Sequence, residues 1–210
     1  MMKALGVVEE TDQTTDEVLL SRYRDEGRTA DFDALVHRYE RELYRYLVRY
    51  TGDAALAEDV FQNTFLQVHL KRGLYEDGRP VRPWLYSIAT HQAVDALRKS
   101  GRHPTISLDH RGGSGGDSEP SALIDLLVGD AEGPLAELQG EERKEWVRSA
   151  VEKLPDALKQ TLILAYFQDL KYREIADIQK IPVGTVKSRL HAALAKLQEM
   201  AKSAQHDGSE

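Results

Sequence analysis

The segment from Tyr172 to Leu197 constrains the fold of this chain most, because its pattern predicts two helices joined by a sharp turn. Ile175, Ala176 and Ile178 give the first, short helix one apolar face. The Ile-Pro pair at 181–182 ends it, since proline lacks an N–H donor and disfavours helix in the residue before it. Apolar residues then recur at helical spacing at Val186, Leu190, Ala193, Leu194 and Leu197. The segment is therefore predicted to be a helix-turn-helix.

The opposite side of the second helix carries small and basic residues near its N-terminus. Such residues suit a close approach to phosphates and base edges of DNA. The predicted DNA-facing residues are Gly184, Thr185, Lys187, Ser188, Arg189 and His191. An ordinary helical hairpin with a solvated basic face has the same composition, and the mechanics of the motif favour DNA binding over that alternative.

The amino-acid composition limits the classes of protein to which this chain can belong. The chain has 210 residues, 41% hydrophobic and 30% charged, which is typical of a globular protein with one large or two small domains. No apolar run approaches the roughly 18 to 20 residues that span a membrane, and Met1 is not followed by a signal-peptide pattern. The absence of cysteine excludes disulfides and thiolate metal sites. These features predict a cytoplasmic protein without membrane insertion.

The net charge of −7 is unusual for a nucleic-acid binder, but the charges are unevenly distributed. Residues 171–202 contain seven Lys or Arg and three acidic residues, whereas residues 106–140 contain one Arg and seven acidic residues. Distribution matters more than the sum, so the acidity lies largely outside the predicted DNA-facing segment.

Residues 103–133 are rich in Gly, Ser and acidic residues and show no sustained period. Such a composition predicts a flexible acidic linker. Its two short apolar islands, 106–109 and 122–128, are either ordered turns or plain spacer. We therefore expect an all-α chain of two small helical domains, 16–102 and 134–202, the second containing the helix-turn-helix.

Helical periodicity in the N-terminal domain predicts helices over Asp16–Arg24, Thr29–Tyr50, Ala54–Leu70 and Pro83–Ser100. The Thr-Gly-Asp stretch at 51–53 is expected to end the second helix and cap the third. In the third, one face is apolar, and the other presents Asp59, Gln62, Asn63 and Leu66. A leucine among polar residues on an exposed face is typical of a protein-binding surface, although lone exposed leucines are common.

The helix over 83–100 has an outward face that is basic and hydroxyl-bearing. We expect that face to comprise Ser87, Thr90, His91, Val94, Arg98 and Lys99, with Arg102 just beyond. Such a face suits a nucleic-acid strand with unstacked bases, but for this helix alone a solvated face over a Trp and Leu core is the better interpretation.

Four stretches, taken in order, resemble a known family. They are AEDVFQNTFL at 57–66, PWLYSIATHQAVDALRK at 83–99, LPDALKQTLILAYFQDLKYREIADI at 154–178 and IPVGTVKSRLHAAL at 181–194. Together they resemble the bacterial RNA polymerase sigma factors of the extracytoplasmic-function (ECF) group. The resemblance covers roughly residues 16–197, and four motifs in order are far more specific than one.

The resemblance implies an alternative sigma factor that binds core RNA polymerase and promoter DNA. The helix at 57–70 would bind the β′ coiled coil through Asp59, Gln62, Asn63 and Leu66. The segment 84–99 and the loop before it would capture and melt the −10 element, through Thr90, His91, Val94, Arg98, Lys99 and Arg102. The helix-turn-helix would read the −35 element. The linker would thread toward the RNA exit path. An anti-sigma factor is the expected further partner, and no metal or cofactor is expected.

The chain departs from the family pattern at several positions. The turn of the helix-turn-helix usually carries Leu-Gly, where this chain has Gln179 and Lys180. Because glycine adopts a left-handed conformation at little cost, Lys180 implies mild strain or a remodelled turn. His91 stands where Asn is frequent, which puts base preference there in doubt.

Two other classes remain as alternatives. One is a helix-turn-helix transcriptional regulator with a helical N-terminal interaction domain and no affinity for polymerase. The other is a protein–protein adaptor that never contacts DNA, which the basic C-terminal helix disfavours. An enzyme is a distant third, because no nucleophile–base constellation or glycine-rich phosphate loop is present.

Overall fold

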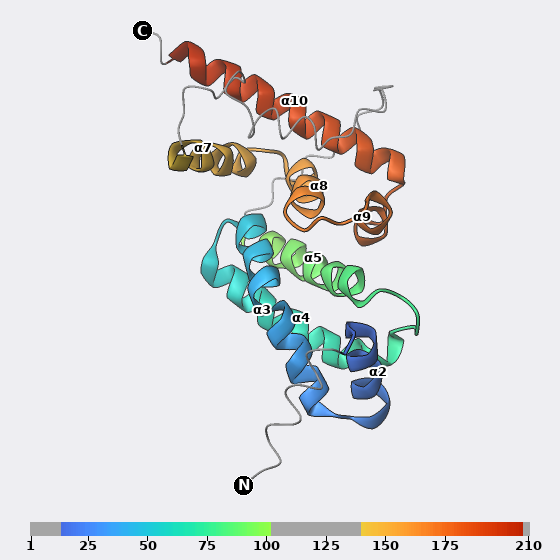
Figure 1. Ribbon diagram of the computed structural model, residues 1–210. Helices are drawn as coiled ribbons and strands as arrows, with labels where there is room; N and C mark the ends of the chain where they lie inside the picture. Colours follow the sequence, from blue (N-terminus) through green and yellow to red (C-terminus); the bar gives the residue numbers. More distant parts are fainter. Residues whose placement is uncertain (1–13, 102–139, 208–210) are drawn as a thin grey trace. The chain divides into compact units, whose positions relative to one another are not determined.

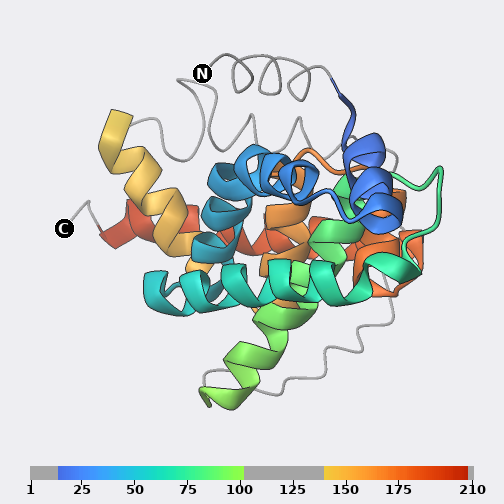
Figure 2. The same ribbon diagram turned by 90° about the horizontal axis from the view of Figure 1, so that it is seen from below.

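The computed structural model describes residues 14–101 and 140–207, and the chain divides into two compact units, Met1–His103 and Pro104–Glu210. All regular elements in the described residues are helices (Figures 1 and 2), so the predicted all-α class is confirmed. The predicted linker at 103–133, Arg102 and the outer parts of both tails lie outside the described residues. None of the described helices is long and apolar enough to cross a membrane.

The N-terminal unit contains four α-helices and one 3-10 turn within residues 14–101. They are α2 (Asp16–Glu26), α3 (Thr29–Thr51), α4 (Ala54–Lys71), η1 (Arg72–Leu74) and α5 (Val81–Lys99). Local chemistry sets their ends, as predicted. Gly52 ends α3 with φ of 70°, and the Asp53 carboxylate begins α4 by accepting from the N–H groups of Ala55 and Leu56 at 2.9 and 3.1 Å.

The core of this unit lies between α3, α4 and α5, with α2 packed against α3 and α5. Figure 2 shows α4 and α5 crossing rather than running side by side. Tyr46 of α3 is fully buried at the centre, with its ring edge-on to Tyr86 of α5 at 5.1 Å between centroids. Arg82 Nε and the Tyr86 hydroxyl both donate to Glu42 Oε1, at 3.1 and 3.0 Å, which ties the start of α5 to α3.

The described part of the C-terminal unit contains α7 (Gly140–Glu152), α8 (Asp156–Tyr166), α9 (Tyr172–Gln179) and α10 (Val183–Asp207). The long α10 packs against α8 and α9 (Figure 1). The apolar stripes predicted for both helices of the helix-turn-helix are buried, at Ile175, Ala176, Ile178, Val186, Leu190, Ala193, Leu194 and Leu197. The helix-turn-helix expected from the sequence is thus α9, residues 180–182 and α10.

Candidate polymerase and nucleic-acid interfaces

The turn of the helix-turn-helix is closed by Lys180 in the left-handed conformation, at φ 54° and ψ 45°. Its N–H donates to the Ala176 carbonyl, as does the N–H of Ile181 at 3.0 Å. A side chain in this conformation costs roughly 1–2 kcal/mol that a glycine would not incur. Of the two outcomes expected for Lys180, the structure therefore shows strain in a turn of glycine-like geometry.

The predicted DNA-facing residues of α10 lie on the sides that its buried stripe leaves open. Gly184, Lys187 and Ser188 are exposed, and Thr185, Arg189 and His191 are half-buried. Arg189 is held at one flank, where its Nη1 donates to Gln179 Oε1 at 3.1 Å. Burial lowers the pKa of the Arg189 guanidinium. No local sequence pattern predicts this bond, because it joins two different helices.

On α5, five of the six residues predicted to face outward are accessible and one is not. His91, Arg98 and Lys99 are exposed, and Ser87 and Val94 are half-buried. The outward placement of Thr90 is wrong, because its side chain is 3% exposed and its Oγ1 lies 2.7 Å from the Tyr46 hydroxyl. Thr90 lies four residues after the buried Tyr86, so helical geometry puts it on the inner face.

The predicted polymerase-facing side of α4 is exposed at all four positions, Asp59, Gln62, Asn63 and Leu66. The leucine is 52% exposed, and it is followed at four-residue intervals by Leu70 at 63% and Leu74 at 75%. Leu66 is therefore the start of an exposed leucine row (Leu66, Leu70 and Leu74) that crosses from α4 into η1. The four-residue spacing of these leucines is a sequence signal that extends the predicted surface beyond Leu66.

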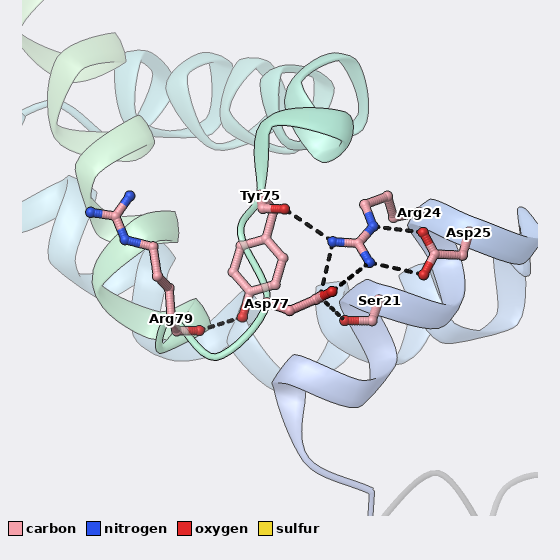
Figure 3. A network of polar contacts seen from close by, with 6 residues as sticks. All are labelled: Ser21, Arg24, Asp25, Tyr75, Asp77 and Arg79. Atoms are coloured by element: carbon pink, nitrogen blue, oxygen red, sulfur yellow. Dashed lines mark hydrogen bonds and ion pairs between the residues drawn. The ribbon is translucent and has the colours of Figure 1, made fainter.

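The loop between α4 and α5, residues 75–80, is held in shape by α2 (Figure 3). Arg24 Nη1 donates to the Tyr75 carbonyl at 3.0 Å and lies 2.9 Å from Asp77 Oδ1. The Ser21 hydroxyl donates to the same carboxylate oxygen at 3.0 Å. One turn earlier on α2, Glu17 accepts from the N–H of Val81 at 3.2 Å. We call Glu17, Ser21 and Arg24, which are spaced i, i+4 and i+7, the α2 clamp.

Electrostatic and aromatic contacts also stabilise the conformation of the loop at 75–80. Hydrogen bonds from Arg24 and then Ser21 lower the pKa of Asp77, so the clamp meets an ionised carboxylate at neutral pH. The Tyr75 hydroxyl donates to the Arg79 carbonyl (Figure 3), and its ring packs edge-on to Trp84 at 5.4 Å. The loop thus has a defined form before any ligand binds.

Comparisons with known proteins match both units of the chain to one family. Family models match Sigma-70 region 2 at residues 35–103 and Sigma-70, region 4 at residues 144–197. ECF RNA polymerase sigma factor SigW of Bacillus subtilis is 28% identical over 189 residues, covering 89% of this chain and 98% of that protein. ECF RNA polymerase sigma factor SigL of Mycobacterium tuberculosis is 34% identical over 170 residues, covering 79% and 85%.

A solved structure shares the fold. The sigma factor RpoE of Bartonella quintana, crystallised with the anti-sigma factor NepR, is 22% identical and matches with a TM-score of 0.57 over 82% of this chain and 97% of that one. Taken with the two sequence relatives, the chain belongs to the ECF group of RNA polymerase sigma factors. It is an alternative sigma factor that directs RNA polymerase.

Proposed function

We propose that this sigma factor binds core RNA polymerase through the exposed face of α4, with Asp59, Gln62, Asn63 and Leu66 against the β′ coiled coil. The observation that carries the proposal is the exposure of all four residues on a helix whose other face is buried in the core. An apolar centre with a polar rim is typical of protein interfaces, and Leu66 and Leu70 supply the apolar part.

The −10 element is proposed to contact α5 and the loop at 75–80. The exposed side chains His91, Arg98 and Lys99 with Val94 form this surface, and Arg102 follows it in the chain. Such a surface would bind unstacked bases better than duplex DNA. Its binding would then shift the equilibrium toward the open promoter, without covalent chemistry. Thr90 contributes from the inside, by fixing α5 against α3 through Tyr46.

The −35 element is proposed to bind α10 through Gly184, Thr185, Lys187, Ser188, Arg189 and His191. Phosphate contacts set the position of such a helix, and a few base-edge contacts select the sequence. Residues 16–102 and 134–202 then act as two DNA-reading domains joined by residues 103–133. Because polymerase carries both to the promoter, neither needs high affinity of its own.

Two further assignments follow from this role. Polymerase and promoters are in the bacterial cytoplasm, so we place the protein there, acting by binding rather than catalysis. We also propose an anti-sigma factor as a partner, which would cover the exposed leucine row and keep the protein from polymerase until it is released. The exposure of three leucines in one row supports a protein partner.

The test is the affinity of the full chain for bacterial core polymerase. Replacing Asp59, Gln62 and Leu66 together by alanine is expected to weaken binding at least roughly tenfold, since interface centres dominate affinity. A matched control replaces Glu40, Arg41 and Tyr44 on α3, which are also exposed. Equal binding by both variants would overturn the proposal. Duplex binding without any polymerase affinity would favour a conventional regulator.

A further inference from the structure

Gln179, the last residue of α9, joins three helices of the C-terminal unit, α8, α9 and α10, through its carboxamide. Its Nε2 donates to Gln160 Oε1 at 2.9 Å. Its Oε1 accepts from Thr161 Oγ1 at 3.0 Å and from Arg189 Nη1 at 3.1 Å. The first two partners belong to α8 and the third to α10.

A polar residue is unexpected at this position. Gln179 follows the buried Ile175 by four residues, so it continues the inner stripe of α9, and the resemblance places leucine there. A half-buried amide costs free energy unless it is hydrogen-bonded. Here the oxygen accepts two bonds and the nitrogen donates one, so the cost is largely offset.

The acceptor that Arg189 bonds is a neutral group rather than a carboxylate. Among the described residues, no carboxylate forms an ion pair with Arg189, and its hydrogen bond goes to a neutral amide oxygen. A guanidinium has five N–H donors in a rigid plane. One bond to a neutral acceptor restrains that plane without neutralising the charge, and leaves donors for acceptor atoms on base edges in a DNA groove.

We propose that Gln179 is a positioning residue for −35 recognition, which presents the Arg189 guanidinium in a fixed orientation to duplex DNA. Orienting the side chain before binding removes part of the entropy cost of immobilising it in the complex. The proposal rests on the proposed reading of the −35 element by α10. It makes residue 179, which need not touch DNA, a determinant of promoter affinity.

A double-mutant cycle on the holoenzyme tests it, with the full chain and a promoter that the wild-type holoenzyme selects. Gln179→Leu is expected to weaken promoter affinity roughly 3- to 10-fold, the effect of one side chain that must be ordered on binding. Arg189→Ala should weaken it at least as much. In the Arg189→Ala background, Gln179→Leu should have no further effect, because Gln179 acts through Arg189.

Two control measurements distinguish the positioning role of Gln179 from a general loss of binding. On DNA with a randomised −35 element, and in core polymerase binding, Gln179→Leu should equal wild type. Gln179→Glu, which replaces the Nε2 donor to Gln160 by a carboxylate oxygen and pairs the guanidinium with a carboxylate, should also weaken −35 binding. Additive losses, or equal losses on both DNAs, would overturn the positioning role. If wild type itself does not distinguish the two DNAs, the proposed function of α10 fails instead.

Discussion

The hydroxyl groups of Tyr46 and Thr90 lie 2.7 Å apart in the interior of the N-terminal unit and join α3 to α5. Both side chains are buried, and the bond spans 44 positions of sequence. The same two helices hold the proposed surfaces in place, since α5 carries the proposed −10 surface and α3 packs on α4, which carries the proposed polymerase surface.

Removing one hydroxyl should destabilise the unit rather than change DNA contacts. Tyr46→Phe or Thr90→Val leaves a buried partner unsatisfied, and we expect the free energy of unfolding to fall by about 1–3 kcal/mol. Chemical denaturation followed through Trp84 fluorescence, in a Trp146→Phe background, measures this. The exposed neighbour His91 is the control, and His91→Ala should change stability by less than about 0.5 kcal/mol. Impaired promoter opening by Thr90→Val at unchanged stability would instead indicate a DNA contact.

Alkaline pH should destabilise the same unit. Burial is the main factor that raises the pKa values of Tyr39, Tyr46 and Tyr86 above the ordinary value of about 10. Above pH 10 the unfolded chain therefore loses phenolic protons that the folded chain keeps, and the free energy of unfolding falls as pH rises. At pH 11 each tyrosine accounts for up to about 1.4 kcal/mol. Denaturation between pH 8 and 11 tests the slope, which Tyr46→Phe should reduce and Tyr44→Phe, at an exposed site, should not.

Breaking the α2 clamp should loosen the loop at 75–80 while the core stays folded. Arg24→Ala removes the bonds to the Tyr75 carbonyl and the Asp77 carboxylate. We expect faster amide hydrogen exchange at residues 77–81 and reduced promoter opening, with core polymerase affinity unchanged. Arg45→Ala, an exposed arginine of α3, is the matched control. Unchanged exchange in Arg24→Ala would show that the loop does not depend on α2.

Lys180→Gly should stabilise the C-terminal unit. It removes a left-handed backbone cost of roughly 1–2 kcal/mol and adds unfolded-state entropy worth about 0.5–1, for a net gain of up to about 1 kcal/mol. Lys180→Val should destabilise, because β-branched residues avoid this conformation. Denaturation followed through Trp146, in a Trp84→Phe background, measures both. Lys196→Gly, in the interior of α10, should have the opposite sign from Lys180→Gly, at a cost of about 1 kcal/mol. A loss of stability in Lys180→Gly would contradict the conclusion that Lys180 is held in a strained conformation.

The features that the sequence predicted correctly are those that depend on residues close together in the chain. The buried stripe from Val186 to Leu197 follows from the 3.6-residue period, and the break at Gly52 and Asp53 from capping chemistry. Thr90 was misplaced because its hydroxyl suggested solvent, whereas the partner that makes it suitable for the core, Tyr46, is distant in sequence. The bonds from Arg24 to Asp77 and from Arg189 to Gln179 depend on how helices pack, which no local pattern contains.

The most direct test of the central claim is run-off transcription by bacterial core polymerase on a library of promoter DNA, with and without this protein. We predict promoter-specific transcripts that share −10 and −35 sequences, depend on the protein, and disappear when Asp59, Gln62 and Leu66 are replaced together by alanine. The absence of protein-dependent transcripts and of core polymerase binding, in a chain that still binds duplex DNA, would contradict it.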